Sequence, residues 1–179
     1  MKPLKEFTIQ FIGLKVGEHH FEYDINTEFF NFFEFDEFND VDLTANVVLN
    51  KKTTLLEFHF QVSGIINVNC DNTNEPFNQK INSGLDLVVK FGDRYNNENE
   101  DILIIPHGEY EINIAQYIYE LIVLAVPKKL VHPGVKDGTL DSEILKKLEE
   151  LRPKDLNQRI NNGEIDPRWN TLKKLLTDK

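Results

Sequence analysis

The side chains most able to bind a metal ion or move a proton gather shortly before the last third of the chain. His107, Glu109 and Glu111 alternate in sequence, so an extended backbone would place all three on one face. An imidazole and two carboxylates on one face could ligate a metal ion. The alternative is that they are solvated residues leading into the next helix, and we favour it because the motif is short and unspecific. We therefore predict no metal ion here.

Cys70 is the only cysteine, so the chain can form no intramolecular disulfide and no cysteine-rich zinc site. A nucleophilic thiol needs a nearby base and electropositive surroundings, whereas the neighbouring Asp71 would raise the thiol pKa. We predict that Cys70 is a small, semi-buried strand residue. The histidines offer no better site, because adjacent His19 and His20 would point to opposite faces of a strand and His59 would lie exposed on a polar face.

The sequence contains none of the common motifs of enzyme active sites. No segment matches a phosphate-binding glycine loop, the nucleophile elbow of hydrolases or the dinucleotide-binding fingerprint. We therefore assign no catalytic residue, no cofactor and no metal ligand, and we predict that the chain is not an enzyme. The remaining candidates are residues that could contact a partner.

Aromatic and acidic residues interleave over residues 28–40, with phenylalanine at 29, 30, 32, 33, 35 and 38. The simpler interpretation is a short helix or turn that caps the core while its acids face water. The alternative is a dock for a basic protein segment, with aromatic anchors and complementary charge. Phe35, Asp36 and Glu37 are the candidate partner-binding residues of this segment.

The formal net charge of −10 bears on the class of partner. Nucleic-acid binders usually present a basic face, because neutralising phosphates supplies most of their non-specific affinity. The chain as a whole would repel RNA, so a basic protein partner is easier to accommodate and any direct RNA contact would be local. Lys128 and Lys129 are adjacent basic residues and candidates for such a contact.

Strands over the first two-thirds of the chain must position these residues. Apolar and polar residues alternate over 7–11, 21–25, 41–49 and 56–62, which predicts strands with one buried face. The polar turn at 50–53 joins the last two of them as a hairpin.

The alternating pattern continues beyond this hairpin. Gly64 breaks the run, residues 66–70 continue it, and further strands are predicted at 85–91 and 102–105, with a mobile loop at 92–101. Many sequential strands with one buried face predict an antiparallel curved sheet or a partly open β-barrel.

The last third changes to a helical period. Asn113 fits an N-cap with Gln116 at capping-box spacing, and apolar residues cover most of the circumference behind it. We predict a helix that is buried against the sheet and ends at Pro127. A second helix, capped by Asp141, is predicted to end before Pro153. The predicted fold class is therefore α+β.

The chain is predicted to form one α+β domain over residues 1–152, a linker at 153–165 and a C-terminal helix at 166–179. Asp166 and Pro167 fit the N-cap and first helical position of that last helix. A helix this short is marginal alone in water, so we expect it to dock on its own domain or on a partner.

The C-terminal helix also carries candidate contact residues. Arg168 and Trp169 belong to the residue types that most often dominate interfaces. Lys173 and Lys174 follow one turn later and make a local basic patch that could contact phosphate.

Three segments resemble the YceD family of bacterial and plastid proteins. Residues 64–77 resemble the strand that leads into the family's cysteine turn, and residues 109–132 resemble its strand followed by a helix ending in proline. Residues 166–175, which read Asp-Pro-Arg-Trp and then Leu-Lys-Lys-Leu, resemble its C-terminal signature. The resemblance covers residues 1–178 and implies a role in the accumulation or processing of large-subunit ribosomal RNA.

The chain departs from the family pattern at its cysteines. Many relatives carry cysteine pairs that look like a metal ribbon, one pair in the turn and another after the helix. Thr73 stands at the second cysteine of the turn, and residues 131–134 stand where the later pair would be. The resemblance is therefore to a cysteine-poor branch, and zinc binding does not carry over.

Residues and resemblance together predict a non-catalytic, cytoplasmic assembly factor that acts on the precursor of the large ribosomal subunit. Its partner would be that precursor or a basic ribosomal protein, for which the acidic and aromatic segment at 28–40 could be the dock. The alternative is an enzyme or small-ligand carrier that uses the barrel mouth. Inward strand positions read Phe, Leu, Val and Ile, so the predicted interior is filled by side chains.

We predict no contact with a membrane. The most hydrophobic stretch, residues 112–126, contains Asn113, Gln116 and Glu120 and is too short to span a bilayer. The N-terminal residues alternate in polarity and lack the unbroken apolar run of a signal peptide.

Overall fold

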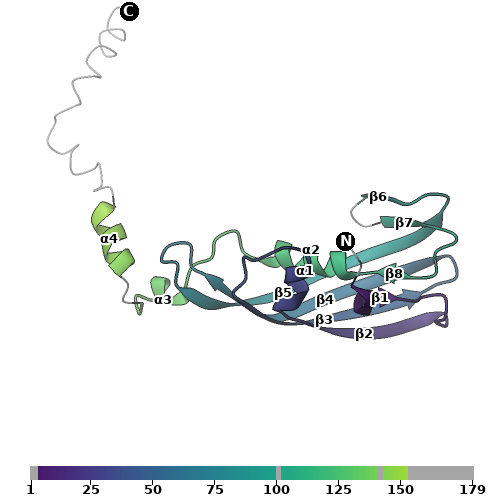
Figure 1. Ribbon diagram of the computed structural model, residues 1–179, viewed down its shortest axis with the longest axis horizontal. Coiled ribbons are helices and arrows are strands. Elements are labelled where there is room, and N and C mark those ends of the chain that lie inside the picture. The colour runs from purple at the N-terminus through teal and green to yellow at the C-terminus, as the bar shows by residue number, and fades with distance from the viewer. Residues whose placement is uncertain (1–3, 100–101, 141–142, 153–179) are drawn as a thin grey trace, which may run out of the picture.

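The computed structural model describes residues 4–99, 102–140 and 143–152. A six-stranded mixed sheet in the order β2-β3-β4-β5-β7-β6 forms the body, and a separate two-stranded sheet pairs β1 with β8. The helices lie against one face of the large sheet or beyond its end: α1 and α2 cover that face, β6 and β7 lie at one end, and α3 and α4 extend past the other end (Figure 1). The described chain is α+β and mostly strand.

The elements have the following bounds in chain order. The strands are β1 (Thr8–Ile9), β2 (Gly17–Ile25), β3 (Asp40–Lys51), β4 (Leu55–Asn69), β5 (Pro76–Gly92), β6 (Asn96–Asn99), β7 (Ile102–Pro106) and β8 (Ile112–Asn113). The helices are the 3-10 turn η1 (Lys5–Phe7), α1 (Thr27–Phe32), α2 (Ala115–Ala125), α3 (Pro133–Lys136) and α4 (Glu143–Leu151).

β3 and β4 form the antiparallel hairpin that the sequence pattern predicts. Their register pairs Val47 with Phe60 and Leu49 with Phe58, and all four side chains are at most 1% exposed. Burying a side chain of this size contributes about 1.5–3 kcal/mol, so this hairpin supplies a large share of the core. The strand predicted at 21–25 is also confirmed, as β2, and it starts four residues earlier at Gly17.

Gly64 does not interrupt β4, contrary to the prediction. The strand runs through it without a shift of register and pairs Gly64 with Leu43 on one side and Ile81 on the other. Its φ of +146° is a conformation that residues with a side chain rarely adopt. A β-carbon here would overlap the carbonyl oxygen of Asp42, so both the backbone conformation and the close approach of β3 require glycine.

β5 begins at Pro76, well before the predicted start at residue 85. The alternation in its first half is hidden because Gln79 and Ser83, on the inward side, are polar. Pairing with β4 nevertheless runs without a break from Pro76 to Lys90.

Two features between β5 and β7 correct the sequence prediction. β7 pairs with β5 in parallel, from Val88 with Ile102 to Gly92 with Pro106, so the sheet is mixed and not antiparallel throughout. The segment predicted as a mobile loop at 92–101 contains β6, which pairs antiparallel with β7. Because strand pairing uses backbone groups, the Asn- and Glu-rich composition of β6 did not reveal it.

Over the described part of the chain the sheets do not close into a barrel. There β1 and β8 pair only with each other, and β2 and β6 are the edges of the large sheet. The strand predicted at 7–11 is reduced to β1, although Phe7, Ile9 and Phe11 are all buried. Of the two predicted alternatives, a curved sheet or a partly open barrel, the curved sheet is compatible with what is observed.

α2 is the buried helix that the sequence predicts. Ile118 and Ile122 are fully buried against the sheet, and the helix ends at Ala125 before Pro127. The predicted capping box does not form. Asn113 accepts a hydrogen bond from the Ala115 N–H at 3.1 Å, but the N-cap position is Ile114 and the Gln116 side chain bonds Glu120.

α4 agrees with the second predicted helix, although Asp141 lies outside the described residues. None of its residues is buried, so it contributes nothing to the core of the domain. The short helix α3, which begins at Pro133, was not predicted. The linker at 153–165 and the helix at 166–179 lie outside the described residues. Among the helices of the described ranges, none combines the length and apolar character needed to cross a bilayer.

Candidate partner-binding surfaces

The structure separates the residues that the sequence grouped as metal-ligand candidates. The His107 ring stacks on Phe91, with ring centroids 6.5 Å apart. Glu109 and Glu111 instead line a groove beside α2. Over residues 4–99, 102–140 and 143–152, no group of three His, Cys, Asp or Glu side chains could hold a metal ion.

His19 and His20 lie on β2, and His59 lies on β4. His59 Nδ1 is 2.5 Å from Asp86 Oδ1 across β4 and β5, and both side chains are more than half exposed. None of the described residues that line the hollow around this pair carries a hydroxyl or thiol that the pair could activate. The His19 ring bonds the carbonyl oxygen of Lys15.

Cys70 is buried at 2% exposure and lies at the end of β4 in a tight turn. The His132 N–H donates to its sulfur at 3.3 Å. Burial raises the pKa of the thiol, but hydrogen bonds from His132, from the Thr73 hydroxyl and from the backbone of Asn72 and Thr73 outweigh it, so the pKa lies below its ordinary value.

This environment corrects the prediction that Asp71 raises the pKa of the Cys70 thiol, because that pKa is lowered and Asp71 is not among the causes. The Asp71 carboxylate accepts from the Leu130 N–H at 2.7 Å, and the Asp71 N–H donates to the Leu130 carbonyl at 2.8 Å. The turn after β4 is thus tied to the segment after α2 by hydrogen bonds on both sides. These bonds hold the last part of the described domain against the end of the sheet.

The same turn does not fit the zinc site that the family pattern implies. Thr73 is buried where a second cysteine would be, and its hydroxyl is hydrogen-bonded to the sulfur of Cys70. His132 presents its ring to Phe77 and uses Nδ1 to accept from the Gly134 N–H at 3.0 Å. One sulfur that already accepts several hydrogen bonds does not make the four-ligand shell of structural zinc.

The acidic and aromatic segment forms a cap over the core. Asn26 caps α1 by accepting from the Glu28 and Phe29 N–H groups. Phe29, Phe30 and Phe38 are buried, which agrees with the simpler of the two interpretations.

The surface of this cap nevertheless presents both aromatic and acidic groups. Phe35 is only half-buried and packs on Phe38 and Tyr119, with ring centroids 4.9 and 5.9 Å away. Asp36 and Glu37 beside it are exposed. From residue 16 to residue 50 the chain contains no lysine or arginine, so no basic residue of this segment neutralises these carboxylates.

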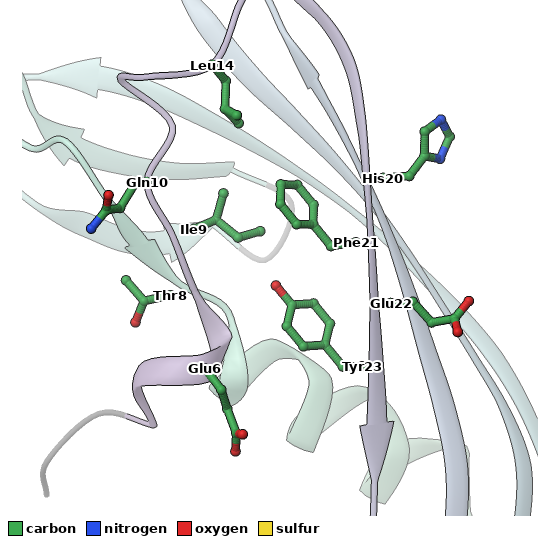
Figure 2. A pocket seen from close by; sticks show the side chains of 9 residues that line it. All are labelled: Glu6, Thr8, Ile9, Gln10, Leu14, His20, Phe21, Glu22 and Tyr23. Atoms are coloured by element: carbon green, nitrogen blue, oxygen red, sulfur yellow. The ribbon is translucent and has the colours of Figure 1, made fainter.

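A space of about 580 Å³ separates β1 from the edge strand β2. Figure 2 shows Ile9, Leu14, Phe21 and Tyr23 pointing into this space, whereas His20 and Glu22 point away from it. Side chains, and no backbone pairing, therefore bridge β1 and β2. At this place the two sheets are not joined by strand pairing.

A larger groove of about 990 Å³ lies between α2 and the strands β5, β6 and β7. Its apolar lining residues are Leu85, Leu87, Tyr95, Leu103, Ile105, Pro106, Ile112, Tyr117, Leu121 and Leu124. Tyr95 and Leu124 are the most exposed of them, at 59% and 83%. The groove therefore offers apolar surface that the fold itself leaves uncovered.

The charged groups of the groove are all acidic. Glu109, Glu111 and Glu120 line it, and among the described residues that line it there is no lysine, arginine or histidine. Burial raises the pKa of Tyr117 to about 12, and repulsion from the negative charge of Tyr95 and Glu120 adds to the effect. At neutral pH the Tyr117 hydroxyl is therefore a neutral hydrogen-bond donor within an acidic site.

Sequence reasoning missed this groove. Gln116, Glu120 and Leu124 follow each other at four-residue spacing, which places them on one helical face beside the buried one. That spacing is the signal that could have indicated a second functional face of α2. The contribution of β6 and of Glu109 could not be foreseen, because it depends on the position of β7 in the sheet.

Of the basic candidates, the structure describes only Lys128 and Lys129. Lys128 and Lys129 are exposed just after α2, on the segment that Asp71 anchors. The other four candidates, Arg168, Trp169, Lys173 and Lys174, lie outside the described residues.

Comparison with known proteins adds one finding. The family model described as "Large ribosomal RNA subunit accumulation protein YceD" matches residues 58–176. The match begins within β4 and therefore includes β5, α2 and the groove between them. No curated protein and no solved structure matches the chain.

Proposed function

The chain belongs to the YceD family, and from this membership we propose that it is a non-catalytic factor that supports accumulation or processing of large-subunit ribosomal RNA. The family match over residues 58–176 is the observation that carries the proposal. We propose that it acts in the cytoplasm, on the precursor of the large ribosomal subunit.

The chemistry of the described residues supports a binding role. The single thiol is buried and held by hydrogen bonds, and the His59–Asp86 pair has no nucleophile beside it. Catalysis by either group would require a reacting atom to reach it in a defined position. Neither arrangement provides that position, whereas the surface offers charge and apolar area for recognition.

Charge favours a protein over RNA as the direct partner. Ribosomal RNA and this chain are both negatively charged, so a basic ribosomal protein is the component that the chain attracts. The acidic cap around Asp36 and Glu37, with half-buried Phe35 between the acids and the core, has the composition of a dock for such a segment.

Direct RNA contact would be local. Lys128 and Lys129 are exposed and adjacent, and Arg168, Lys173 and Lys174 are basic residues near the C-terminus. Contacts from these residues to phosphate would weaken as salt concentration rises. They would position the factor on the precursor after the protein contact has formed.

Deletion of the gene tests the proposed function. We expect the ratio of large-subunit to small-subunit ribosomal RNA to fall, and an intact gene supplied in trans to restore it. An unchanged ratio, including during growth in the cold, would contradict the proposal.

A matched pair of variants then tests the acidic cap. The variant Asp36→Lys with Glu37→Lys reverses two exposed charges of the cap, and we expect it not to restore the ratio. The control is Glu18→Lys with Glu22→Lys, which reverses two exposed charges on β2 and changes the net charge equally. Equal restoration by both variants would remove the cap from the contact surface.

A further inference from the structure

β5 has one edge that the fold leaves unpaired beside the groove. On one side β5 pairs with β4 from Pro76 to Lys90. On the other side β7 reaches only Val88–Gly92. Within the described ranges, no residue forms a backbone hydrogen bond to that side of β5 between Ile81 and Leu87. The backbone N–H and C=O groups that point away from β4 in this stretch are thus available to another strand.

The groove lies along this open edge. Ser83, Gly84, Leu85 and Leu87 of β5 all line it. On the inward face of β5, Ile81 and Leu87 are fully buried, whereas Ser83 and Leu85 between them are only half-buried. The core is therefore incompletely covered at the place where strand pairing stops.

α2 forms the opposite wall at a distance that leaves room for side chains. Tyr117, Leu121 and Leu124 present apolar surface to the groove, and the volume of about 990 Å³ lies at the upper end of the range for ligand sites, roughly 300–1,000 Å³. A strand added to β5 would point alternate side chains into this space and the others toward solvent.

The charge of the groove selects the chemistry of the added strand. Among the described lining residues, none is basic and three are acidic, Glu109, Glu111 and Glu120. Glu109 and Glu120 are exposed and Glu111 is half-buried, so basic side chains on the solvent-facing side of the strand would be attracted to them and phosphate would be repelled. The Tyr117 hydroxyl, which stays protonated at neutral pH, can donate to a backbone carbonyl of the strand.

We propose that a short, extended, basic segment of a protein partner binds by adding as a strand to the β5 edge at residues 81–87, with its alternate apolar side chains in the groove. The proposal rests on the proposed function, which makes a basic ribosomal protein the expected partner class. Strand addition combines backbone hydrogen bonds for affinity with side-chain pockets for specificity. A helix in the same groove would cover the open edge without pairing its N–H and C=O groups, which is unfavourable.

The test uses the full-length protein and a synthetic probe. The probe is a fluorescent peptide of about eight residues with alternating lysine and valine, long enough to follow the open edge at about 3.3 Å per residue. We expect saturable binding by fluorescence anisotropy that weakens with salt. N-methylation of the backbone at the alternate residues that face β5 should abolish binding, whereas N-methylation at the intervening residues should not.

Matched variants locate the binding site. The triple variant Glu109→Gln, Glu111→Gln and Glu120→Gln should weaken binding by about ten-fold, as expected for three partly exposed ion pairs. The control with Glu34→Gln, Asp36→Asn and Glu37→Gln removes the same charge from the acidic cap and should leave binding unchanged. Thermal melts of both variants establish that each is folded.

Several results would overturn the proposal. Equal binding of both N-methylated probes would exclude strand addition, and equal weakening by the two triple variants would exclude the groove. Tighter binding of a helical peptide of the same composition would assign the groove to a helix. Displacement of the probe by a peptide of residues 166–179 would assign it to this chain's own C-terminal end, and binding of a single-stranded RNA oligonucleotide sensitive to the same variants would assign it to RNA.

Complementation of the deletion separates this proposal from the proposed function. If deletion leaves the ribosomal RNA ratio unchanged, the proposed function is wrong whatever the peptide shows. If deletion lowers the ratio and the groove variant restores it fully, the family function stands and the groove proposal is overturned. Loss of restoration together with loss of probe binding supports both.

Discussion

Replacement of Gly64 by alanine probes how tightly the centre of the sheet is built. Gly64 lies within β4 and pairs with Leu43 of β3 and Ile81 of β5. Its φ is +146°, and a β-carbon on it would overlap the Asp42 carbonyl oxygen and lie 2.9 Å from the Leu43 α-carbon. Both contacts are with backbone, which cannot move aside as the end of a flexible side chain can.

The cost is the sum of two destabilising effects, reduced by one stabilising effect. Holding a residue other than glycine at this φ costs about 1–3 kcal/mol, and the overlap with β3 adds about 1–3 kcal/mol. Alanine recovers about 0.5–1 kcal/mol because its unfolded chain is less flexible than that of glycine. We expect a net loss of about 3 kcal/mol in the free energy of unfolding, which lowers Tm by roughly 6–12 °C for a chain of this size.

Two further glycines separate the cost of the positive φ from the cost of the overlap with β3. Gly17 has a φ of +128° but open space around its β-carbon position, so Gly17→Ala should show the conformational cost alone, about 1 kcal/mol. Gly13 has neither a positive φ nor a neighbour within 4 Å, so Gly13→Ala should show only the gain from a less flexible unfolded chain and raise Tm by roughly 1–4 °C. Thermal melts followed by circular dichroism measure all three. The reasoning is refuted if Gly64→Ala melts within a degree or so of Gly13→Ala, since the expected cost is several times larger.

Three other measurements test separate parts of the structure. Leu121→Ala should cost about 2–5 kcal/mol in denaturant unfolding because Leu121 is a buried residue of α2, whereas exposed Leu124→Ala should change stability by no more than about 0.5 kcal/mol. In an alkaline titration followed by tyrosinate absorbance, Tyr117 should ionise last, near pH 12, and Tyr117→Phe should remove that step. Because its folded pKa is raised above 10.0, the stability linked to Tyr117 is fully present below pH 10.0 and is lost as pH rises toward 12. Elemental analysis of the purified protein should find no stoichiometric zinc, since Cys70 is the only sulfur ligand available, and one tightly held equivalent would contradict this.

The parts of the fold that the sequence predicts are those stabilised by local alternation. β3 and β4 each place every second side chain in the core, so Val47 and Phe60 could be recognised from their neighbours alone. α2 could be predicted in the same way, because its apolar residues recur with the period of a helix. The first half of β5 escaped prediction because Gln79 and Ser83 interrupt its apolar face, and its strand geometry comes from pairing with β4.

The candidate surfaces also differ in whether their contacts are local in sequence, and this decides which of them could be predicted. The acidic cap around Phe35 is local, so its residues could be proposed from the sequence and were found together in the structure. The environment of Cys70 is not local, because the hydrogen bond to its sulfur comes from His132, far along the chain. The sequence therefore led to the wrong direction for the shift of the thiol pKa, which Asp71 was expected to raise.

The sequence by itself determined the class of fold, the acidic character of the surface and the buried faces of β3, β4 and α2, because side-chain period and net charge are properties of the chain as written. Only the tertiary structure decided that β7 pairs in parallel with the end of β5 and stops at Val88. That pairing is made by backbone groups, which are the same for almost every residue, so no side-chain pattern specifies where it ends. The open edge of β5 and the acidic groove beside it exist because of that end point.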